Sequence, residues 1–224
     1  MGLDFDSFVL TAATADLSDE PAAREHADAV EFRMDLADEP LVALEAYDGE
    51  LPILATNRAE WEGGEASDEG RLEALADATA FEAVAAIDVE LESILDGDAD
   101  ELLETARERD VSIVASAHDF EGTPPRKELV RTLTEAGKYA DVAKLAVTAE
   151  SKADTLALLS ATEQLTSHGD TVATMAMGEV GSHTRAVAPV YGSKIGYAPV
   201  DPADATAPGQ YDLETLAELV AHLE

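Results

Sequence analysis

The feature that most constrains the fold is a regular alternation of two kinds of segment along the chain. Short apolar runs recur, and acidic stretches rich in alanine and leucine separate them with helical spacing. Strands that alternate with helices predict βαβ units and therefore a parallel sheet. The eight apolar runs are Phe8–Ala12, Ala29–Arg33, Pro52–Thr56, Ala86–Glu90, Val111–Ser116, Val142–Ala146, Thr171–Met175 and Lys194–Tyr197.

The acidic stretches between these runs predict helices. The last stretch shows the pattern plainly, because its large apolar residues recur with spacings typical of one helix face. These residues are Leu213, Leu216, Val220 and Leu223. Examples of the predicted helices are Glu69–Phe81, Ala99–Glu108, Arg126–Gly137, Ser151–Thr166 and Asp212–Leu223.

Eight strand–helix repeats in 224 residues have the size of a compact (β/α)8 TIM barrel of the α/β class. We therefore expect residues 1–224 to form a single catalytic domain. A doubly wound open sheet is the alternative. Such a sheet usually carries a glycine fingerprint after its first strand, and the segment 11–14 (Thr-Ala-Ala-Thr) is not one.

The charge balance is extreme, with 48 acidic and 14 basic residues and a formal net charge of −34. Such a surface repels phosphate backbones and anionic membranes, so we expect no nucleic-acid or membrane partner. The N-terminus lacks the basic region of a signal peptide, and no apolar run reaches the ~18 residues of a membrane span. We expect a cytoplasmic protein that works in high salt, where screening weakens carboxylate repulsion.

One lysine, Lys144, lies inside an apolar run. If the run is a strand, Val142, Lys144 and Ala146 share one face. A buried ammonium without a fixed counter-charge is costly, so a lysine in this position tends to lose its proton. A neutral, desolvated lysine is the nucleophile of Schiff-base enzymes. The alternative is an edge strand from which Lys144 reaches out to water.

Further polar residues stand at or just past the ends of the predicted strands, where a barrel builds its active site. His118 follows the fifth run and is placed to act as a general base. A metal site is not indicated, because no second histidine or cysteine stands at ligand spacing. Singly, the others have structural explanations, such as an ion pair between Glu31 and Arg33 or a helix cap at Arg185. The whole set is Glu31, Arg33, Arg58, Glu62, Asp88, Glu90, His118, Lys144 and Arg185.

A series of short motifs gives a more specific indication, and together they resemble type I 3-dehydroquinate dehydratases. The motifs are Glu31-Phe32-Arg33-Met34-Asp35, Thr56-Asn57-Arg58 with Glu62-Gly63-Gly64, Ile87-Asp88-Val89-Glu90, Ser116-Ala117-His118-Asp119-Phe120, Asp141-Val142-Ala143-Lys144, Met175-Ala176-Met177-Gly178 with Thr184-Arg185, Gly192-Ser193, and Ala207-Pro208-Gly209-Gln210. They run in order from the second strand to the eighth, and the acidic composition points to a halophile.

The resemblance implies dehydration of 3-dehydroquinate to 3-dehydroshikimate, in the shikimate pathway of aromatic amino-acid biosynthesis. It implies a Schiff base on Lys144, with His118 as general acid and base and Glu62 orienting His118. It also implies no cofactor, no metal and a homodimer. Substrate-binding residues would be Glu31, Arg33, Arg58, Arg185, Thr206 and Gln210, with apolar walls from Phe120, Met175, Met177 and Tyr191.

Two other functions stay open from the residues. One is another Schiff-base barrel, such as a class I aldolase, in which Gly192-Ser193 would help to bind a sugar phosphate. The other is a barrel without catalytic activity. The segment 201–210, rich in small residues, is expected to be a mobile lid over the site, because it carries Thr206 and Gln210 but no large apolar anchor.

Overall fold

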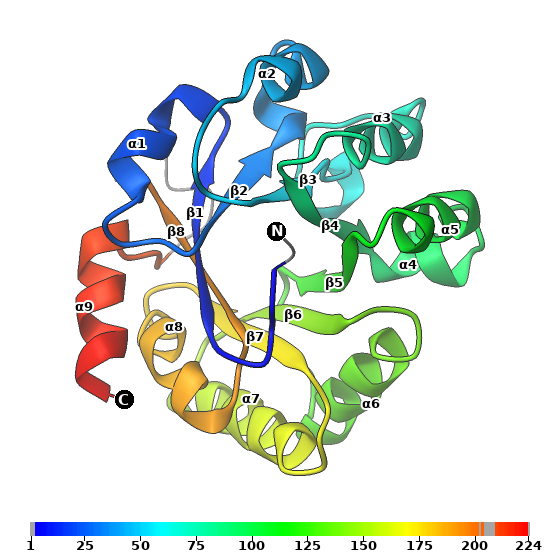
Figure 1. Cartoon of the computed structure of the whole chain (residues 1–224). Coiled ribbons are helices and arrows are strands. Elements are labelled where there is room, and N and C mark those ends of the chain that lie inside the picture. Colours follow the sequence, from blue (N-terminus) through cyan, green and yellow to red (C-terminus); the bar gives the residue numbers. More distant parts are fainter. Residues whose placement is uncertain (1–2, 202, 204–208, 224) are drawn as a thin grey trace.

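The computed structural model describes residues 3–201, 203 and 209–223, and these form one nearly closed barrel of parallel strands surrounded by helices (Figure 1). The barrel is a (β/α)8 fold, as predicted, and not an open doubly wound sheet. Its strands are β1 (Val9–Thr14), β2 (Ala29–Arg33), β3 (Ile53–Thr56), β4 (Val84–Glu90), β5 (Ser112–Asp119), β6 (Val142–Thr148), β7 (Val172–Met177) and β8 (Ile195–Pro199).

The helices cover the outside of the barrel (Figure 1). The α-helices are α1 (Glu20–Ala23), α2 (Pro40–Ala46), α3 (Arg71–Ala78), α4 (Leu91–Leu95), α5 (Asp100–Glu108), α6 (Arg126–Ala136), α7 (Lys152–Thr166), α8 (Thr184–Val187) and α9 (Leu213–Leu223). Short 3-10 turns lie at η1 (Leu17–Asp19), η2 (Met34–Leu36), η3 (Glu60–Glu62) and η4 (Ala188–Tyr191). All five helices named from the sequence are present. On α9, however, Leu223 is 47% exposed, because it lies at the free end of the helix.

The strands pair in the order β7-β6-β5-β4-β3-β2-β1-β8. The ring of strands is open between β7 and β8. A backbone hydrogen bond from Lys194 N, in the residue before β8, to Val172 O of β7 crosses this opening at 2.8 Å. The Ser193 hydroxyl adds a link, since it accepts from Thr174 N at 2.9 Å. The side chain of Ser193 is therefore used to hold the barrel together.

Two apolar layers explain why the strands appear as continuous apolar runs in the sequence. In β6, Val142 and Ala146 face the barrel interior, while Ala143, Leu145 and Val147 pack against the helices. Strands buried on both faces need apolar residues at nearly every position. Phe5 packs into the interior layer from the segment before β1.

The predicted strand positions are confirmed, with shifts at their ends. The largest shift with a functional consequence is in β5, which runs on to Asp119, so that His118 lies within the strand and not after it. This extension could not be predicted from the sequence, because His118 and Asp119 are polar and do not continue the apolar run. In the described residues no helix has the length and apolar character needed to span a membrane.

Candidate active site

Eight of the nine predicted site residues line one small cavity, of about 80 Å³, at the carboxyl ends of the strands. The ninth, Thr206, lies outside the described residues, as does most of the predicted lid (202 and 204–208). The cavity is lined by Glu31, Arg33, Arg58, Glu62, Gly63, His118, Phe120, Lys144, Ala146, Met175, Met177, Arg185, Tyr197 and Gln210.

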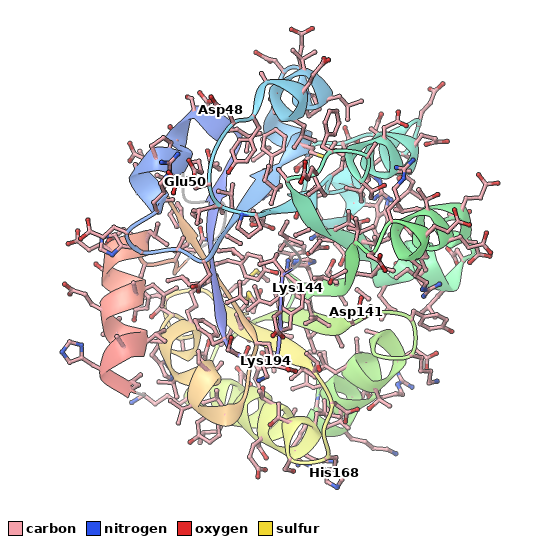
Figure 2. All side chains as sticks on the ribbon, in the orientation of Figure 1. Asp48, Glu50, Asp141, Lys144, His168 and Lys194 are labelled. Atoms are coloured by element: carbon pink, nitrogen blue, oxygen red, sulfur yellow. The ribbon has the colours of Figure 1, made fainter. Side chains whose placement is uncertain are left out.

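Lys144 lies near the centre of the ring, whereas His168 lies on its periphery (Figure 2). It projects from β6, a strand with neighbours on both sides, and is only 4% exposed. The alternative of an edge-strand lysine that reaches water is therefore wrong. The assumption of a missing counter-charge is also wrong, because Lys144 Nζ donates to Asp88 Oδ2 at 2.8 Å. The face of the Tyr197 ring lies 4.4 Å from the same nitrogen.

Asp88 is itself held from its other side. Its Oδ1 accepts hydrogen bonds from Arg58 at 2.7 Å and from the Ser116 hydroxyl at 2.6 Å. Burial raises the pKa of Asp88, but the charges of Arg58 and Lys144 outweigh this effect and hold it below its usual range. Asp88 is thus a fixed, buried carboxylate beside the lysine.

The ion pairs continue outward from Arg58. Its NH1 group donates to Glu90 at 3.1 Å, and Glu90 also pairs with the buried Arg71. Arg71 in turn donates to the Ser93 hydroxyl at 3.0 Å. Arg58 was predicted to bind substrate, and it does line the cavity. Its guanidinium nevertheless donates several of its hydrogen bonds to other residues of the protein.

His118 is fixed by Glu62, which lies in the loop after β3. The Glu62 side chain faces the cavity because the chain turns sharply at Gly63, whose φ is +82°. A Cβ on Gly64 would come within 2.1 Å of the Arg58 carbonyl oxygen, so this close approach requires glycine. Glu62 Oε1 lies 2.9 Å from His118 Nδ1, and Phe120 stacks on the His118 ring with centroids 5.9 Å apart.

The electrostatics of this pair favour an uncharged imidazole. Burial, together with the positive charges of Arg58 and Lys144, lowers the pKa of His118 well below its usual value of 6.5. Burial raises the pKa of Glu62 to about 7, against the opposing effect of Arg58. At neutral pH His118 is therefore uncharged and able to accept a proton.

Glu31 and Arg33 both line the cavity, but they do not pair with each other. Arg33 forms a two-point ion pair with Asp35, at 2.8 and 2.6 Å, and Glu31 accepts from the Thr56 hydroxyl at 3.0 Å. The alternative explanation of these two residues as an ion pair with each other is therefore wrong. Gln210, from the segment before α9, also reaches the cavity.

Arg185 differs from the other cations of the cavity. It is 5% exposed, and within the described part of the chain no carboxylate pairs with it and its Nε has no hydrogen-bond partner. Burial lowers its pKa to about 10, which leaves it charged at neutral pH. A buried guanidinium without a counter-charge is suited to bind an anionic ligand. Arg33 and Arg58, by contrast, are each paired with a carboxylate.

Three of the four residues predicted to form apolar walls do line the cavity. Phe120, Met175 and Met177 line the cavity, but Tyr191 does not, because it lies in η4 and is 40% exposed. The sequence reasoning missed Tyr197, whose alternation with Ile195 on β8 signals an inward-facing position.

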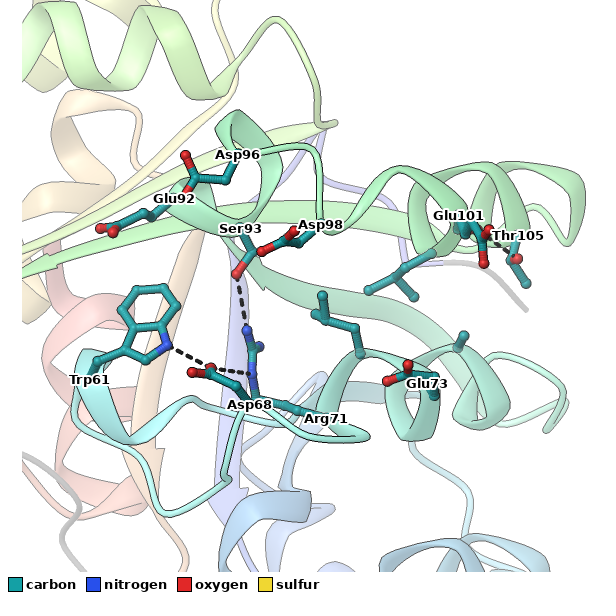
Figure 3. A pocket seen from close by; sticks show the side chains of 13 residues that line it. Trp61, Asp68, Arg71, Glu73, Glu92, Ser93, Asp96, Asp98, Glu101 and Thr105 are labelled. Atoms are coloured by element: carbon teal, nitrogen blue, oxygen red, sulfur yellow. Dashed lines mark hydrogen bonds and ion pairs between the residues drawn. The ribbon is translucent and has the colours of Figure 1, made fainter.

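A larger cavity, of about 660 Å³, lies outside the barrel beside α3, α4 and α5 (Figure 3). Its lining includes Trp61 and also Arg71, which is paired with Glu90. Six carboxylates line it as well, from Asp68, Glu73, Glu92, Asp96, Asp98 and Glu101. This acidic groove repels an anionic substrate and holds no base placed beside a nucleophile. The smaller cavity inside the barrel is therefore the better candidate for the active site.

Two further observations concern phosphate and metal binding. Gly192-Ser193 does not offer a phosphate site, since the Ser193 hydroxyl is buried and bonded to the backbone of Thr174. Among residues 3–201, 203 and 209–223, no group of three or more His, Cys, Asp or Glu side chains is arranged to hold a metal ion. The described residues of the cavity supply an amine, a general base and an anion-binding guanidinium.

Sequence comparisons with known proteins indicate one family. Residues 8–224 match the family described as type I 3-dehydroquinase. The chain is 59% identical over 99% of its length to a 3-dehydroquinate dehydratase of Haloarcula marismortui, with 99% of that protein covered. It is 52% identical to the enzyme of that name from Halobacterium salinarum, over 99% of this chain and all of that one. These haloarchaeal relatives fit the high-salt interpretation of the composition.

A solved structure agrees with the sequence relatives. The 3-dehydroquinate dehydratase of Geobacillus kaustophilus superposes with a TM-score of 0.86 at 28% identity, covering 97% of this chain and 91% of that one. The matched residues and these relatives together show that the chain belongs to the type I 3-dehydroquinase family.

Proposed function

We propose that this protein dehydrates 3-dehydroquinate to 3-dehydroshikimate through a Schiff base on Lys144. The observation that carries the proposal is the convergence, in one small cavity, of a buried lysine, a neutral histidine fixed by Glu62 and an arginine that no carboxylate of the described residues pairs with. A covalent amine, a general base and an anion site are the three parts that this reaction needs.

Lys144 would condense with the C3 ketone of the substrate to form an iminium, with loss of water. The iminium withdraws electrons and acidifies the C2 proton, which His118 Nε2 takes up to leave an enamine. The enamine then expels the C1 hydroxyl, to which His118 returns a proton, so that water departs. Hydrolysis of the new iminium releases the product and restores Lys144.

The other residues would hold the reactants in place. Glu62 fixes the ring of His118 so that Nε2 faces the cavity. Arg185 binds the substrate carboxylate, and the sequence motifs assign ring-hydroxyl and carboxylate contacts to the remaining set. That set is Glu31, Arg33, Arg58, Thr206 and Gln210. The proposed reaction needs no cofactor or metal.

An absorbance assay for the conjugated enone, with 3-dehydroquinate at high salt, tests the reaction. The nucleophile is tested by reducing the reacting mixture with borohydride and mapping the adduct after digestion. We expect the adduct on Lys144. Lys194 is the control, because it precedes β8 at the opposite end of the barrel and its Nζ donates to the Asp6 carbonyl. Turnover of phosphorylated sugars but not of dehydroquinate, or no adduct on Lys144, would overturn the proposal.

We also propose that the enzyme is a homodimer located in the cytoplasm. The dimer is the family expectation, and the location follows from a pathway of small soluble metabolites. Analytical ultracentrifugation at high salt tests the dimer, and a monomer across the concentration range contradicts it.

A further inference from the structure

Two groups that favour positive charge surround the Lys144 nitrogen. Asp88 Oδ2 lies 2.8 Å from it, and the face of the Tyr197 ring lies 4.4 Å from it. We propose that Asp88 is the counter-ion of the Schiff-base nitrogen, with the Tyr197 ring as a second support for its charge. This inference rests on the proposed function, because it requires Lys144 to form the iminium.

The charge balance of the covalent step explains why a counter-ion is suitable here. A lysine ammonium and a ketone give an iminium and one water, so the nitrogen carries one positive charge both before and after the reaction. The amine is neutral only while it attacks the carbonyl carbon. Asp88 is therefore paired with a cation in the resting enzyme and again in the iminium, and the site does not lose an ion pair when the covalent bond forms.

Asp88 is unsuited to take the proton that Lys144 must release before it attacks. The low pKa of this carboxyl, held down by Arg58 and Lys144 against the effect of burial, keeps it ionised. His118, which is neutral at the same cavity, is the better acceptor. Asp88 thus stays an anion through the cycle, and its role is electrostatic.

The surrounding contacts hold the Asp88 carboxylate in one orientation. Ser116 and Arg58 occupy Oδ1, which leaves Oδ2 directed at Lys144. Arg58 also pairs with Glu90, so the arginine keeps one carboxylate partner if the charge of Asp88 is removed. An electrostatic group that is fixed before the reaction needs no reorganisation when charge develops on the nitrogen.

The counter-ion acts on particular intermediates. After His118 removes the C2 proton, the enamine nitrogen is uncharged, although its N–H still faces the carboxylate. The positive charge returns when the hydroxyl departs. Asp88 therefore favours the iminium over the uncharged enamine and assists the elimination step, and its loss lowers the fraction of enzyme present as iminium.

The test is Asp88→Asn, which keeps the shape and removes the charge. We expect kcat to fall by about 10²-fold or more, as for loss of one fixed electrostatic group. We also expect less borohydride-trapped adduct on Lys144 at saturating 3-dehydroquinate, with partial recovery in Asp88→Glu. A purely structural Asp88 would instead raise KM through a displaced Arg58 and leave kcat and the trapped fraction at saturation unchanged, and that result overturns the inference.

Glu20→Gln is the matched control. Glu20 is 1% exposed and ion-paired with Arg24, on α1 and outside the site, so this variant also removes the charge of a buried carboxylate from an ion pair. We expect its kcat and trapped fraction to equal those of the unaltered enzyme. Equal losses in Glu20→Gln and Asp88→Asn would show a general effect on stability and overturn the specific role of Asp88.

A second variant keeps the inference testable if circular dichroism shows that Asp88→Asn does not fold. Tyr197→Leu removes the aromatic face, and we expect the trapped fraction to fall by roughly 2- to 30-fold, with a smaller loss in Tyr197→Phe. Equal trapping in Tyr197→Leu and the unaltered enzyme then overturns the inference. Absence of any adduct in the unaltered enzyme overturns the proposed function instead.

Discussion

Glu62 Oε1 lies 2.9 Å from both the backbone nitrogen and the ring Nδ1 of His118. One carboxylate oxygen thus fixes the residue at two points, and the backbone N–H and the ring N–H both donate to it. The proton on Nδ1 leaves the lone pair on Nε2, the nitrogen that can accept a substrate proton. The same contact brings Glu62 into a buried position where its negative charge is costly.

The first prediction is that Glu62→Gln stabilises the fold while it lowers activity. Glutamine keeps an oxygen for His118 but carries no charge. Because the pKa of Glu62 is raised from 4.5 to about 7 in the folded protein, its ionised form costs stability. A shift of that size corresponds to about 3 kcal/mol in the free energy of unfolding above pH 7.

The sign of the effect sets the measurement. A carboxyl with a raised pKa contributes stability below its unfolded pKa of 4.5, and this contribution is lost as the pH rises through about 7. Urea unfolding at a series of pH values should therefore show the advantage of Glu62→Gln growing across this window. An advantage that is constant with pH, or a loss of stability above pH 7, contradicts the prediction.

The second prediction concerns the pH dependence of kcat/KM. His118 must be uncharged to act as a base, and its lowered pKa places the acid limb of the profile below pH 6.5. Arg185 must be charged to bind a carboxylate, and its pKa of about 10 places loss of binding near that pH. Initial rates at low substrate concentration should fall outside these limits, with a smaller step near pH 7 where Glu62 loses its proton. A midpoint of the acid limb above pH 6.5 contradicts the assignment of His118.

The third prediction is that Arg185→Met raises KM by about 10- to 150-fold, the range for loss of hydrogen bonds to a charged group. The physical reason is that Arg185 has no internal carboxylate partner in the described residues, so its interactions are available to the substrate. Arg131→Met, which removes an exposed arginine from α6, is the control and should leave KM unchanged. An Arg185→Met enzyme with unchanged KM would show that another group binds the carboxylate.

The strands could be placed from the sequence because parallel strands buried on both faces need continuous apolar runs. The alternation also placed Lys144 on one strand face with Val142 and Ala146, and in the structure this face is the barrel interior. The end of β5 could not be placed, because His118 and Asp119 are polar and interrupt the apolar run although the strand continues through both.

The partner of Lys144 could not be predicted either. Asp88 is on β4 and Lys144 on β6, with β5 between them in the sheet. In the register of the paired strands, Glu90 lies opposite Ser116, and Ser116 lies opposite Lys144. Lys144 is therefore level with Glu90, two positions beyond Asp88. Because of this offset, the side chains of Asp88 and Lys144 meet across the barrel interior. Strand offset and curvature are set by the closed barrel and leave no local mark in the sequence.

The last prediction is that the melting temperature rises with potassium chloride well beyond 0.1 M. The net charge of −34 makes the folded chain repel itself. The screening length shortens from ~10 Å at 0.1 M to ~3 Å at 1 M, so repulsion between neighbouring carboxylates weakens across this range. Sodium chloride should act alike, because screening depends on ionic strength. A flat or falling dependence contradicts the prediction.

The outer acidic groove locates part of this effect. It gathers six carboxylates around one cavity, where Arg71 is already paired with Glu90. Asp98→Asn combined with Glu101→Gln should therefore raise the melting temperature at low salt and flatten its salt dependence. Asp38→Asn combined with Glu108→Gln removes two exposed carboxylates from outside the groove and should do so less. Equal effects of the two pairs would show that the net charge, and not the clustering in the groove, sets the salt dependence.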